Sequence, residues 1–195
     1  MIALEYMIKI AVFASGSGSN AENIVKHFSG SPEVEISLLI SNNPTAGVHE
    51  RMKKLGVPSV TYSKNDFQEA EPILKILTEF HIDWIVLAGF LKKIPALLLQ
   101  AYPNRIINIH PALLPKYGGK GMYGMHVHEA VVAAREKETG ITIHYVNENY
   151  DEGPAIFQAT CPVLPTDTPE DVAHKIHALE YEYFPKVIEQ LILEK

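Results

Sequence analysis

The run from Asp83 to Ala88 is apolar at nearly every position, and it constrains the fold more than any other segment. A strand without a polar face must be covered on both sides, as a central strand is in a parallel sheet flanked by helices. Strand-like and helix-like segments alternate along the chain around this run. Strands are predicted at Lys9–Ala14, Val34–Ile40, Val57–Tyr62, Asp83–Ala88 and Arg105–His110, and helices at Ala21–Phe28, Val48–Leu55, Asp66–Phe80 and Pro95–Ala101.

The C-terminal part of the chain departs from this alternation. A helix near Val127–Lys137 is followed by two consecutive strands, Gly140–Val146 and Ala155–Val163, and then by a long helix, Pro169–Leu193. Two strands joined by a loop predict an antiparallel edge. We therefore expect an α/β fold of three layers, a doubly wound, Rossmann-like, mostly parallel sheet with an antiparallel C-terminal edge, in a single domain of residues 1–195. Residues 1–6 are expected to be a dispensable extension, so that a chain beginning at Met7 folds and functions.

The composition is ordinary for a globular protein and narrows the class of partner. Hydrophobic residues make up 47% of the chain, and the net charge of -6 argues against general nucleic-acid binding. No apolar run is long enough to span a membrane, and none resembles a signal peptide. Cys161 is the only cysteine, so an internal disulfide and a cysteine-rich metal site are excluded, and a free thiol suits the cytoplasm.

The predicted strand Arg105–His110 ends in the sequence Asn-Ile-His-Pro. Because alternate residues of a strand point the same way, Asn108 and His110 are expected to project together while Ile107 and Ile109 pack behind them. An amide can hold a carbonyl oxygen and an imidazole can move a proton, which is the equipment of acyl-type chemistry. The alternative is that the two side chains only satisfy backbone groups of the following loop.

The loop after the first strand, Ser15 to Asn20, reads Ser-Gly-Ser-Gly-Ser-Asn. Its glycines allow the backbone to approach an anion, and Ser19 and Asn20 are expected to cap the next helix, whose N–H groups would face a phosphate. The loop lacks the Gly-Lys-Ser/Thr ending of a P-loop, and Ala21 follows where a dinucleotide fingerprint would have its third glycine. A phosphate monoester is therefore the preferred ligand, and a tight turn with a capped helix is the alternative.

A second polar loop lies between the last two predicted strands, from Asn147 to Pro154. Asp151 in this loop is the residue expected beside His110, because a carboxylate orients an imidazole and favours its protonated form. A solvated acidic turn is the alternative. His126 and His128 open a helix, where residues two apart diverge, so a metal site is not expected there. His144 is expected to be a partner within the sheet or pocket.

Four motifs in this order resemble those of the glycinamide ribonucleotide (phosphoribosylglycinamide) formyltransferases, the folate-dependent transformylases of purine biosynthesis. The resemblance runs from Ile8 to Ile192. The glycine loop alone would be weak evidence, whereas the four motifs together are specific. They are Ser15–Asn20, Leu87-Ala88-Gly89-Phe90, Asn108–Tyr117 and Asp151-Glu152-Gly153-Pro154.

The resemblance implies a formyltransferase fold and a set of site residues. Asn108, His110 and Asp151 match the catalytic trio, and no metal is implied. Contacts to the phosphate and the ribonucleotide are implied for Gly18, Ser19, Asn20, His177, Ala178, Leu179 and Glu180. Contacts to folate are implied for Leu91, Lys92, Lys93, Ile94, Asn108, Asn147, Glu148, Asn149, Tyr150 and Asp151.

The implied reaction transfers a formyl group from 10-formyltetrahydrofolate to the amine of glycinamide ribonucleotide. In this reaction Asn108 would donate a hydrogen bond to the developing oxyanion, and protonated His110, held by Asp151, would supply charge and a proton. The partners would be small molecules, with no nucleic acid and no membrane. The chain would be a cytoplasmic monomer or weak homodimer.

Three features depart from the family pattern. The segment Gly118–Gly124 is longer and richer in glycine than usual, and is either a mobile lid or a surface excursion. Leu91-Lys92-Lys93 stands where other members often have Met-Arg-Ile. Phe67-Gln68-Glu69 offers no match to the family's upstream folate-contacting arginine.

Other functions remain as alternatives. A formyltetrahydrofolate hydrolase would use a similar trio with water as the acceptor, but is expected to carry an N-terminal module, and methionyl-tRNA formyltransferase a basic C-terminal domain. A nucleotide-binding module would need the glycine loop but not the trio. A nicotinamide oxidoreductase is disfavoured because Ser41-Asn42-Asn43 provides no acidic residue after the second strand.

Overall fold

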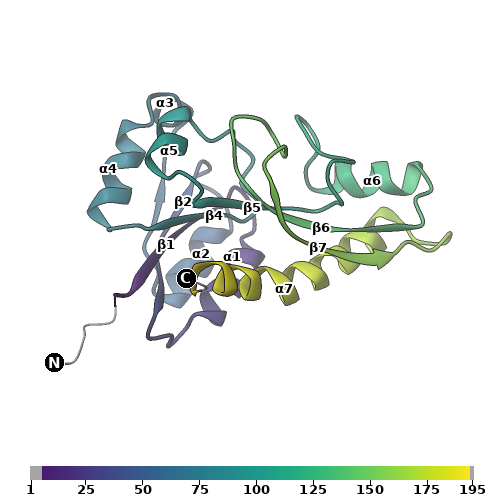
Figure 1. The fold of residues 1–195 in the computed structure, drawn as a ribbon, viewed down its shortest axis with the longest axis horizontal. Helices are drawn as coiled ribbons and strands as arrows, with labels where there is room; N and C mark the ends of the chain where they lie inside the picture. The colour runs from purple at the N-terminus through teal and green to yellow at the C-terminus, as the bar shows by residue number, and fades with distance from the viewer. Residues whose placement is uncertain (1–5, 194–195) are drawn as a thin grey trace. The chain divides into compact units, whose positions relative to one another are not determined.

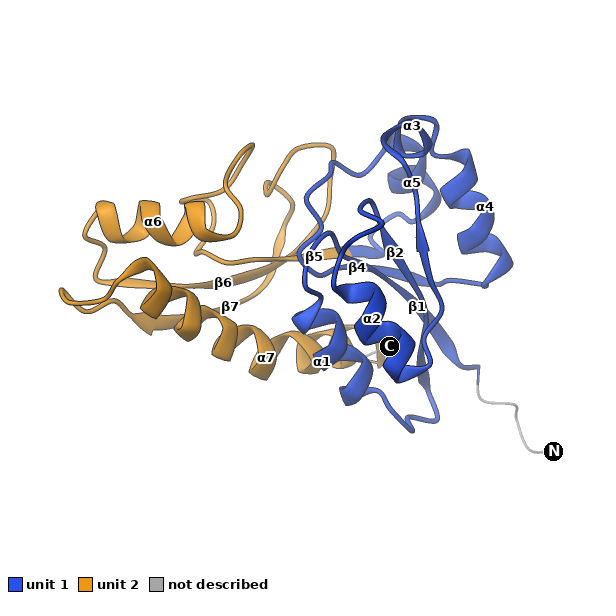
Figure 2. Cartoon of the chain, turned by 180° about the vertical axis from the view of Figure 1, so that it is seen from behind, with its two compact units in different colours: residues 1–106 blue, residues 107–195 orange. Residues whose placement is uncertain are grey.

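The computed structural model describes residues 6–193. The chain separates into two compact units with the boundary after Ile106 (Figure 2). The elements of the first unit are β1 (Ile8–Phe13), α1 (Ser19–His27), β2 (Val34–Ser41), α2 (Val48–Leu55), β3 (Ser59–Thr61), α3 (Lys64–Glu69), α4 (Glu71–Glu79), β4 (Trp84–Leu87) and α5 (Ala96–Ala101) (Figure 1). Those that follow are β5 (Ile106–His110), α6 (Met125–Ala133), β6 (Glu138–Tyr145), β7 (Ala155–Pro162) and α7 (Pro169–Leu193).

The strands of the first unit form a parallel arrangement in the order β3-β2-β1-β4. β1 lies in the middle, with Ile10 opposite Trp84 of β4 and Ile36 of β2. Helices α1 and α2 lie on one face of these strands and α4 on the other (Figures 1 and 2). This covering of both faces explains why the central strands are apolar at successive positions.

The core of the first unit is centred on β1, whose residues from Ile10 to Phe13 are all 0% exposed. Three aromatic rings extend this core toward the end of β4. The ring centroid of Phe90 lies 5.4 Å from that of Phe13 and 5.2 Å from that of Phe67. Because such pairs contribute about 0.5–1.5 kcal/mol each beyond their buried area, Phe90 anchors the segment that follows it.

The second unit contains the antiparallel strands β5, β6 and β7. The register places Asn108 opposite His144 and His110 opposite Thr142. Helices α6 and α7 contact each other, and α7 also contacts β6 and β7. β5 is buried at every position except Asn108, and β6 is buried from Thr139 to His144. Every residue of β7 is exposed or half-buried, as is usual in an edge strand.

The predicted helix Asp66–Phe80 is wrong, because two helices occupy this segment. Helix α3 ends before Ala70, which has a positive φ of 64°, and α4 begins at Glu71. The cause is Pro72, which has no N–H to donate to the carbonyl of Gln68 and whose ring would clash with it. A capping box between Ser63 and Asp66 starts α3 earlier than predicted.

The predicted helix Val127–Lys137 is also misplaced. Helix α6 begins two residues earlier, at Met125, and ends at Ala133. β6 already begins at Glu138, which pairs with Pro162 of β7, so the chain must turn before it. Arg135 makes that turn with a positive φ of 52°.

The predicted fold class is confirmed: parallel strands with helices on both faces lead into an antiparallel C-terminal edge. The prediction of a single domain stays a prediction. Most of the predicted extension, residues 1–5, lies outside the described residues, while Tyr6 is 70% exposed and donates a hydrogen bond to Asp83. None of the described helices has the length and apolar character needed to cross a bilayer.

Candidate active site

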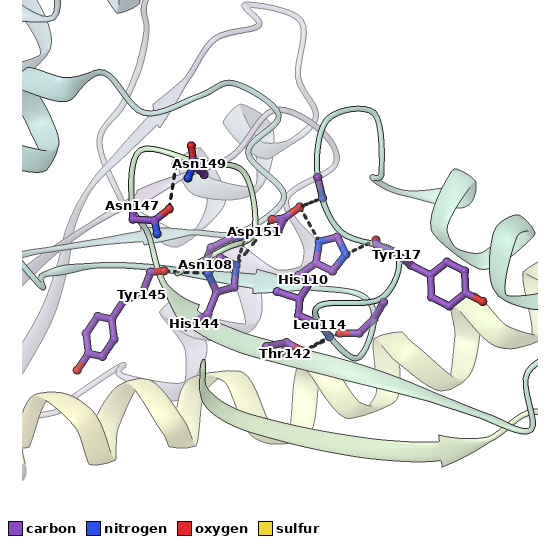
Figure 3. A network of polar contacts seen from close by, with 12 residues as sticks. Asn108, His110, Leu114, Tyr117, Thr142, His144, Tyr145, Asn147, Asn149 and Asp151 are labelled. Carbon is purple, nitrogen blue, oxygen red and sulfur yellow. Dashed lines mark hydrogen bonds and ion pairs between the residues drawn. The ribbon is translucent and has the colours of Figure 1, made fainter. Parts of the chain in front are cut away.

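Asn108, His110 and Asp151 lie together in the second unit (Figure 3). Asn108 and His110 come from the end of β5, and Asp151 comes from the loop between β6 and β7. Asp151 Oδ2 lies 3.5 Å from His110 Nδ1, and the His110 side chain is 4% exposed. The sequence thus predicted correctly that these residues meet, although Asp151 is 41 positions beyond His110.

The position of the Asp151 carboxylate is set by the backbone conformation of Asp151 and by a hydrogen bond from the backbone of Gly119. Asp151 has a positive φ of 57°, a conformation that aspartate tolerates better than most residues. Its Oδ2 atom also accepts a hydrogen bond from the backbone N–H of Gly119 at 2.9 Å. The side chain is 12% exposed. These contacts fix the carboxylate next to the His110 ring.

The other nitrogen of His110 is also engaged. His110 Nε2 lies 2.8 Å from the carbonyl oxygen of Tyr117, which can only accept, so Nε2 carries a proton. Both ring nitrogens of His110 are thus in contact, Nε2 with Tyr117 and Nδ1 with Asp151. The start of the glycine-rich segment 118–124 therefore touches the trio through Gly119 and is more than a surface excursion.

Thr142 of β6 fixes the turn that follows His110. Its buried hydroxyl donates to the carbonyl of Ala112 at 2.7 Å and accepts from the N–H of Leu114 at 3.0 Å. The side-chain amide of Gln158 donates to the same hydroxyl at 2.9 Å. Because one hydroxyl ties three chain segments, the backbone after Pro111 has a defined path away from the site.

His144 belongs to the same network, as expected of a partner within the sheet or pocket, although it was not among the predicted site residues. The side chains of Asn108 and His144 meet with Nδ2 and Nε2 3.1 Å apart, and His144 Nε2 lies 3.8 Å from Asp151 Oδ1 (Figure 3). Burial lowers the pKa of His144 against the opposing pull of Asp151, so the ring is neutral near pH 7. The strand register that pairs Asn108 with His144 would have revealed it, but register is a tertiary property.

The predicted ribonucleotide segment His177–Glu180 lies on α7. His177 and Ala178 are exposed, Leu179 is half-buried and Glu180 is buried. The ring of His177 stacks on that of Tyr181, with an angle of 12° between the ring planes. On the neighbouring helix α6, burial lowers the pKa of His128 to about 4. The Nδ1 atom of His128 has no hydrogen-bond partner among the described residues.

The predicted folate loop, 147–151, has its own internal hydrogen bonds. The side-chain oxygen of Asn147 accepts from the N–H of Asn149 at 2.9 Å, and the amide of Asn149 donates to Glu152 at 2.8 Å. Glu148, Asn149 and Tyr150 are exposed. The loop therefore presents polar side chains on the chain segment that carries Asp151.

The glycine loop belongs to the first unit. The N-cap of α1 is Gly18, so the prediction that Ser19 and Asn20 cap this helix is wrong. Gly18 has a φ of 76°, and a Cβ at this position would lie 2.2 Å from Val48 Cγ2. Only glycine fits this turn, and it takes the chain directly into the helix with Ser19 as its first residue. The main chain of the first turn, rather than a side-chain cap, is what the loop offers to an anion.

Side chains of the first unit hold this loop in place through hydrogen bonds. Arg51 of α2 donates from Nε to the carbonyl of Ser17 at 2.8 Å and pairs through Nη1 with Glu22. The hydroxyl of Ser15 donates to the side-chain oxygen of Asn42 at 2.5 Å and accepts from the N–H of Leu91 at 2.9 Å. Ser15 thus links the glycine loop to the predicted folate segment Leu91–Ile94.

In that segment Leu91, Lys92 and Lys93 are exposed, and Ile94 is buried at 3% exposure. The four side chains therefore differ in their access to a ligand. The first three can reach a ligand, whereas Ile94 packs in the core and holds the segment in place.

Residues 6–193 contain no group of three or more histidine, cysteine, aspartate or glutamate side chains that could hold a metal ion. His126 is exposed and lies 3.5 Å from Glu129, whereas His128 is buried. The two rings thus diverge along α6, as their spacing predicted. The chemistry available at this site is that of an amide donor, a proton-carrying imidazole and a carboxylate.

Comparison with known proteins assigns this arrangement to a family. The family model described as formyl transferase matches residues 8–188. The chain belongs to the formyl transferase family. The match includes the trio of the second unit and the glycine loop of the first, so the predicted resemblance is confirmed.

Two named relatives of this formyl transferase are phosphoribosylglycinamide formyltransferases. It is 38% identical over 191 residues to the phosphoribosylglycinamide formyltransferase of Bacillus subtilis, covering 95% of both chains. It is 39% identical over 193 residues to the chloroplastic phosphoribosylglycinamide formyltransferase of Arabidopsis thaliana, covering 96% of this chain and 66% of the plant protein. The formyl transferase described here thus spans slightly less than two thirds of that plant relative.

Solved structures share the fold of this formyl transferase. The crystal structure of glycinamide ribonucleotide transformylase 1 from Geobacillus kaustophilus superimposes with a TM-score of 0.87 at 38% sequence identity. That match covers 95% of this chain and 99% of the Geobacillus chain.

Proposed function

We propose that this formyl transferase transfers the formyl group of 10-formyltetrahydrofolate to the amine of 5'-phosphoribosylglycinamide, yielding formylglycinamide ribonucleotide and tetrahydrofolate in purine biosynthesis. The observation that carries the proposal is the buried contact between His110 and Asp151 next to the Asn108 amide. The names of the Bacillus and Geobacillus relatives, which match along nearly their full lengths, support the choice of substrates.

The three side chains suit the steps of this reaction. The amine attacks the formyl carbon, a C–N bond forms, and a tetrahedral oxyanion develops. Asn108 donates a hydrogen bond to that oxygen, an interaction that strengthens as the charge appears. His110 contributes positive charge and gives a proton to the folate nitrogen as its bond to carbon breaks, while Asp151 holds the ring in place. The amine releases one proton, which replaces, directly or through water, the proton that His110 gave to the folate nitrogen. The protons therefore balance, and no acyl-enzyme forms.

The binding segments are assigned within the same proposal. Gly18, Ser19 and Asn20 hold the phosphate through the main chain at the start of α1, and residues 177–180 contact the ribonucleotide. Leu91–Ile94 and the loop 147–151, together with Asn108, contact the folate. The support for these roles is the braced, glycine-dependent turn at Gly18 and the exposed side chains of the two folate segments. No metal takes part in the proposed reaction.

The wider setting is also proposed. The partners are these small molecules, without nucleic acid or membrane, which agrees with the net charge of -6. We place the protein in the cytoplasm, because its single cysteine, Cys161, is a free thiol, as suits a reducing compartment. We propose that it is a monomer or weak homodimer.

A spectroscopic assay of folate deformylation tests the proposal. The purified protein is mixed with 10-formyltetrahydrofolate, with and without glycinamide ribonucleotide, and tetrahydrofolate is measured. Product that forms only with the nucleotide is the expected result. Equal product without the nucleotide would identify a hydrolase instead, and no product under either condition would favour a binding module.

A further inference from the structure

His144 occupies a position in the network that the proposed reaction does not use. It is 2% exposed and lies directly opposite Asn108 in the pairing of β5 with β6. Both of its ring nitrogens are in contact: Nδ1 lies 2.9 Å from the carbonyl oxygen of Tyr145, and Nε2 lies 3.1 Å from Nδ2 of Asn108 (Figure 3).

These contacts determine the tautomer. A carbonyl oxygen can only accept, so the proton of the ring is on Nδ1. Burial lowers the pKa of His144, so the ring carries that one proton and Nε2 is a lone pair. A lone pair requires a donor, and the only donor on the Asn108 side chain is its NH2 group. The amide of Asn108 is therefore fixed with Nδ2, rather than Oδ1, next to His144.

We propose that His144 is a positioning residue that sets which end of the Asn108 amide serves the site. This proposal rests on the proposed formyl transfer and deepens it. One N–H of Nδ2 is held by His144, and the second N–H of the same nitrogen is the donor for the developing oxyanion. A rotation of the amide by half a turn would place Oδ1 against the lone pair of Nε2, and the two would repel each other.

The environment of the ring supports this role. Gly153 allows the close packing around the Nδ1 contact, because a Cβ at Gly153 would lie 1.7 Å from the carbonyl oxygen of Tyr145 and 3.5 Å from His144 Nδ1. The charged and titratable groups that act on the ring are Asp151, from the loop after β6, and His110, from β5. The facing residue on β7, Ala155, carries no charge.

Protonation of His144 would reverse the arrangement. Nε2 would become a donor, and it would be attracted to Asp151 Oδ1, 3.8 Å away, and to the oxygen end of the Asn108 amide. The amide would then turn, and the oxyanion donor would be lost. Since the pKa of His144 is below its usual range, this loss belongs to pH values below about 6.5.

Two substitutions separate positioning from packing. His144→Leu removes the acceptor, so the amide loses its preferred orientation and turnover is expected to fall about tenfold, as for one lost hydrogen bond. In His144→Gln the side-chain oxygen can accept from Asn108 but does not titrate. It is expected to recover most of the turnover lost in His144→Leu and to remove the part of the acid limb due to His144. His81→Asn, in the first unit and exposed, is the matched control for loss of an imidazole.

The experiment measures turnover between pH 5 and pH 8 for the four proteins and, independently, the side-chain amide signals of Asn108 by NMR, assigned with Asn108→Ala. The amide signals are expected to move with the titration of the His144 ring and to lose this dependence in His144→Gln. Equal impairment of the Leu and Gln variants, or Asn108 signals that are the same in His144→Leu and wild type, would overturn the proposal. The NMR measurement needs no substrate, so it stands even if the formyl-transfer assay fails.

Discussion

The candidate site residues of the two units are of different chemical kinds. In the first unit the glycine loop offers main-chain atoms, and side chains such as Ser15 and Arg51 act only as braces. In the second unit the groups in question are titratable or hydrogen-bonding side chains, with His110, His144 and Asp151 held in one buried network. The comparison teaches that substitutions in the first unit should affect binding, whereas those in the second should affect turnover and its dependence on pH.

The largest expected effect comes from Asn108→Ala in the second unit. Removal of one oxyanion donor typically lowers turnover by about a hundred- to a thousandfold, with little change in KM. Steady-state kinetics with both substrates measures this, and thermal unfolding serves as the control for folding. A rise in KM with turnover unchanged would show that Asn108 binds a ground state, and the proposed division between the units would fail.

The stability of the second unit should also depend on pH through His128. The pKa of this ring is about 4 in the folded protein against 6.5 in the unfolded chain, because of burial. The unfolded chain therefore takes up a proton first as the pH falls, and stability present above pH 6.5 is lost toward pH 4 by about 3 kcal/mol. His128→Leu should lose that much less stability over the same range, as measured by denaturant unfolding at pH 7 and pH 4. His81→Asn should not change the pH dependence.

Gly18→Ala tests the first unit. The new Cβ would meet Val48, and the φ of 76° suits only glycine, so the start of α1 must shift. We expect KM for the ribonucleotide to rise about tenfold, which corresponds to about 1–2 kcal/mol of strain and lost main-chain contacts, with a smaller change in turnover. Gly16→Ala is the matched control, because a Cβ there meets nothing within 4 Å. If both variants behave alike, the close approach at Gly18 has no role in binding.

The smallest effect is expected from Ser15→Ala. The N–H of Leu91 loses its acceptor, and the predicted folate segment loses one link to the glycine loop. A hydrogen bond of about 1 kcal/mol predicts a roughly fivefold rise in KM for folate. Ser41→Ala is the comparison variant, since the Ser41 hydroxyl contacts only Asn43 among the bonds described. An unchanged KM for folate in Ser15→Ala would show that the segment is held by Phe90 and Ile94 alone.

Predictions from the sequence were most reliable where the structure depends on residues that are close together in the chain. The apolar run before Ala88 predicted a covered parallel strand, and the alternation around Asn108 and His110 predicted their common direction, because both patterns depend only on neighbouring residues. Helix boundaries failed where one residue decided them. Pro72 divided a single predicted helix into α3 and α4, and Gly18 took the cap position predicted for Ser19 and Asn20.

By itself the sequence determined the order of elements, the glycine loop, the amide and imidazole at the end of β5, and the family. Only the tertiary structure decided which side chains surround them. His144 meets Asn108 because β6 pairs with β5 in one register, and Asp151 reaches His110 because the following loop turns back over that pair. A shift of one residue in this pairing would leave the local sequence pattern intact and direct His144 to the opposite face, since side chains alternate along a strand.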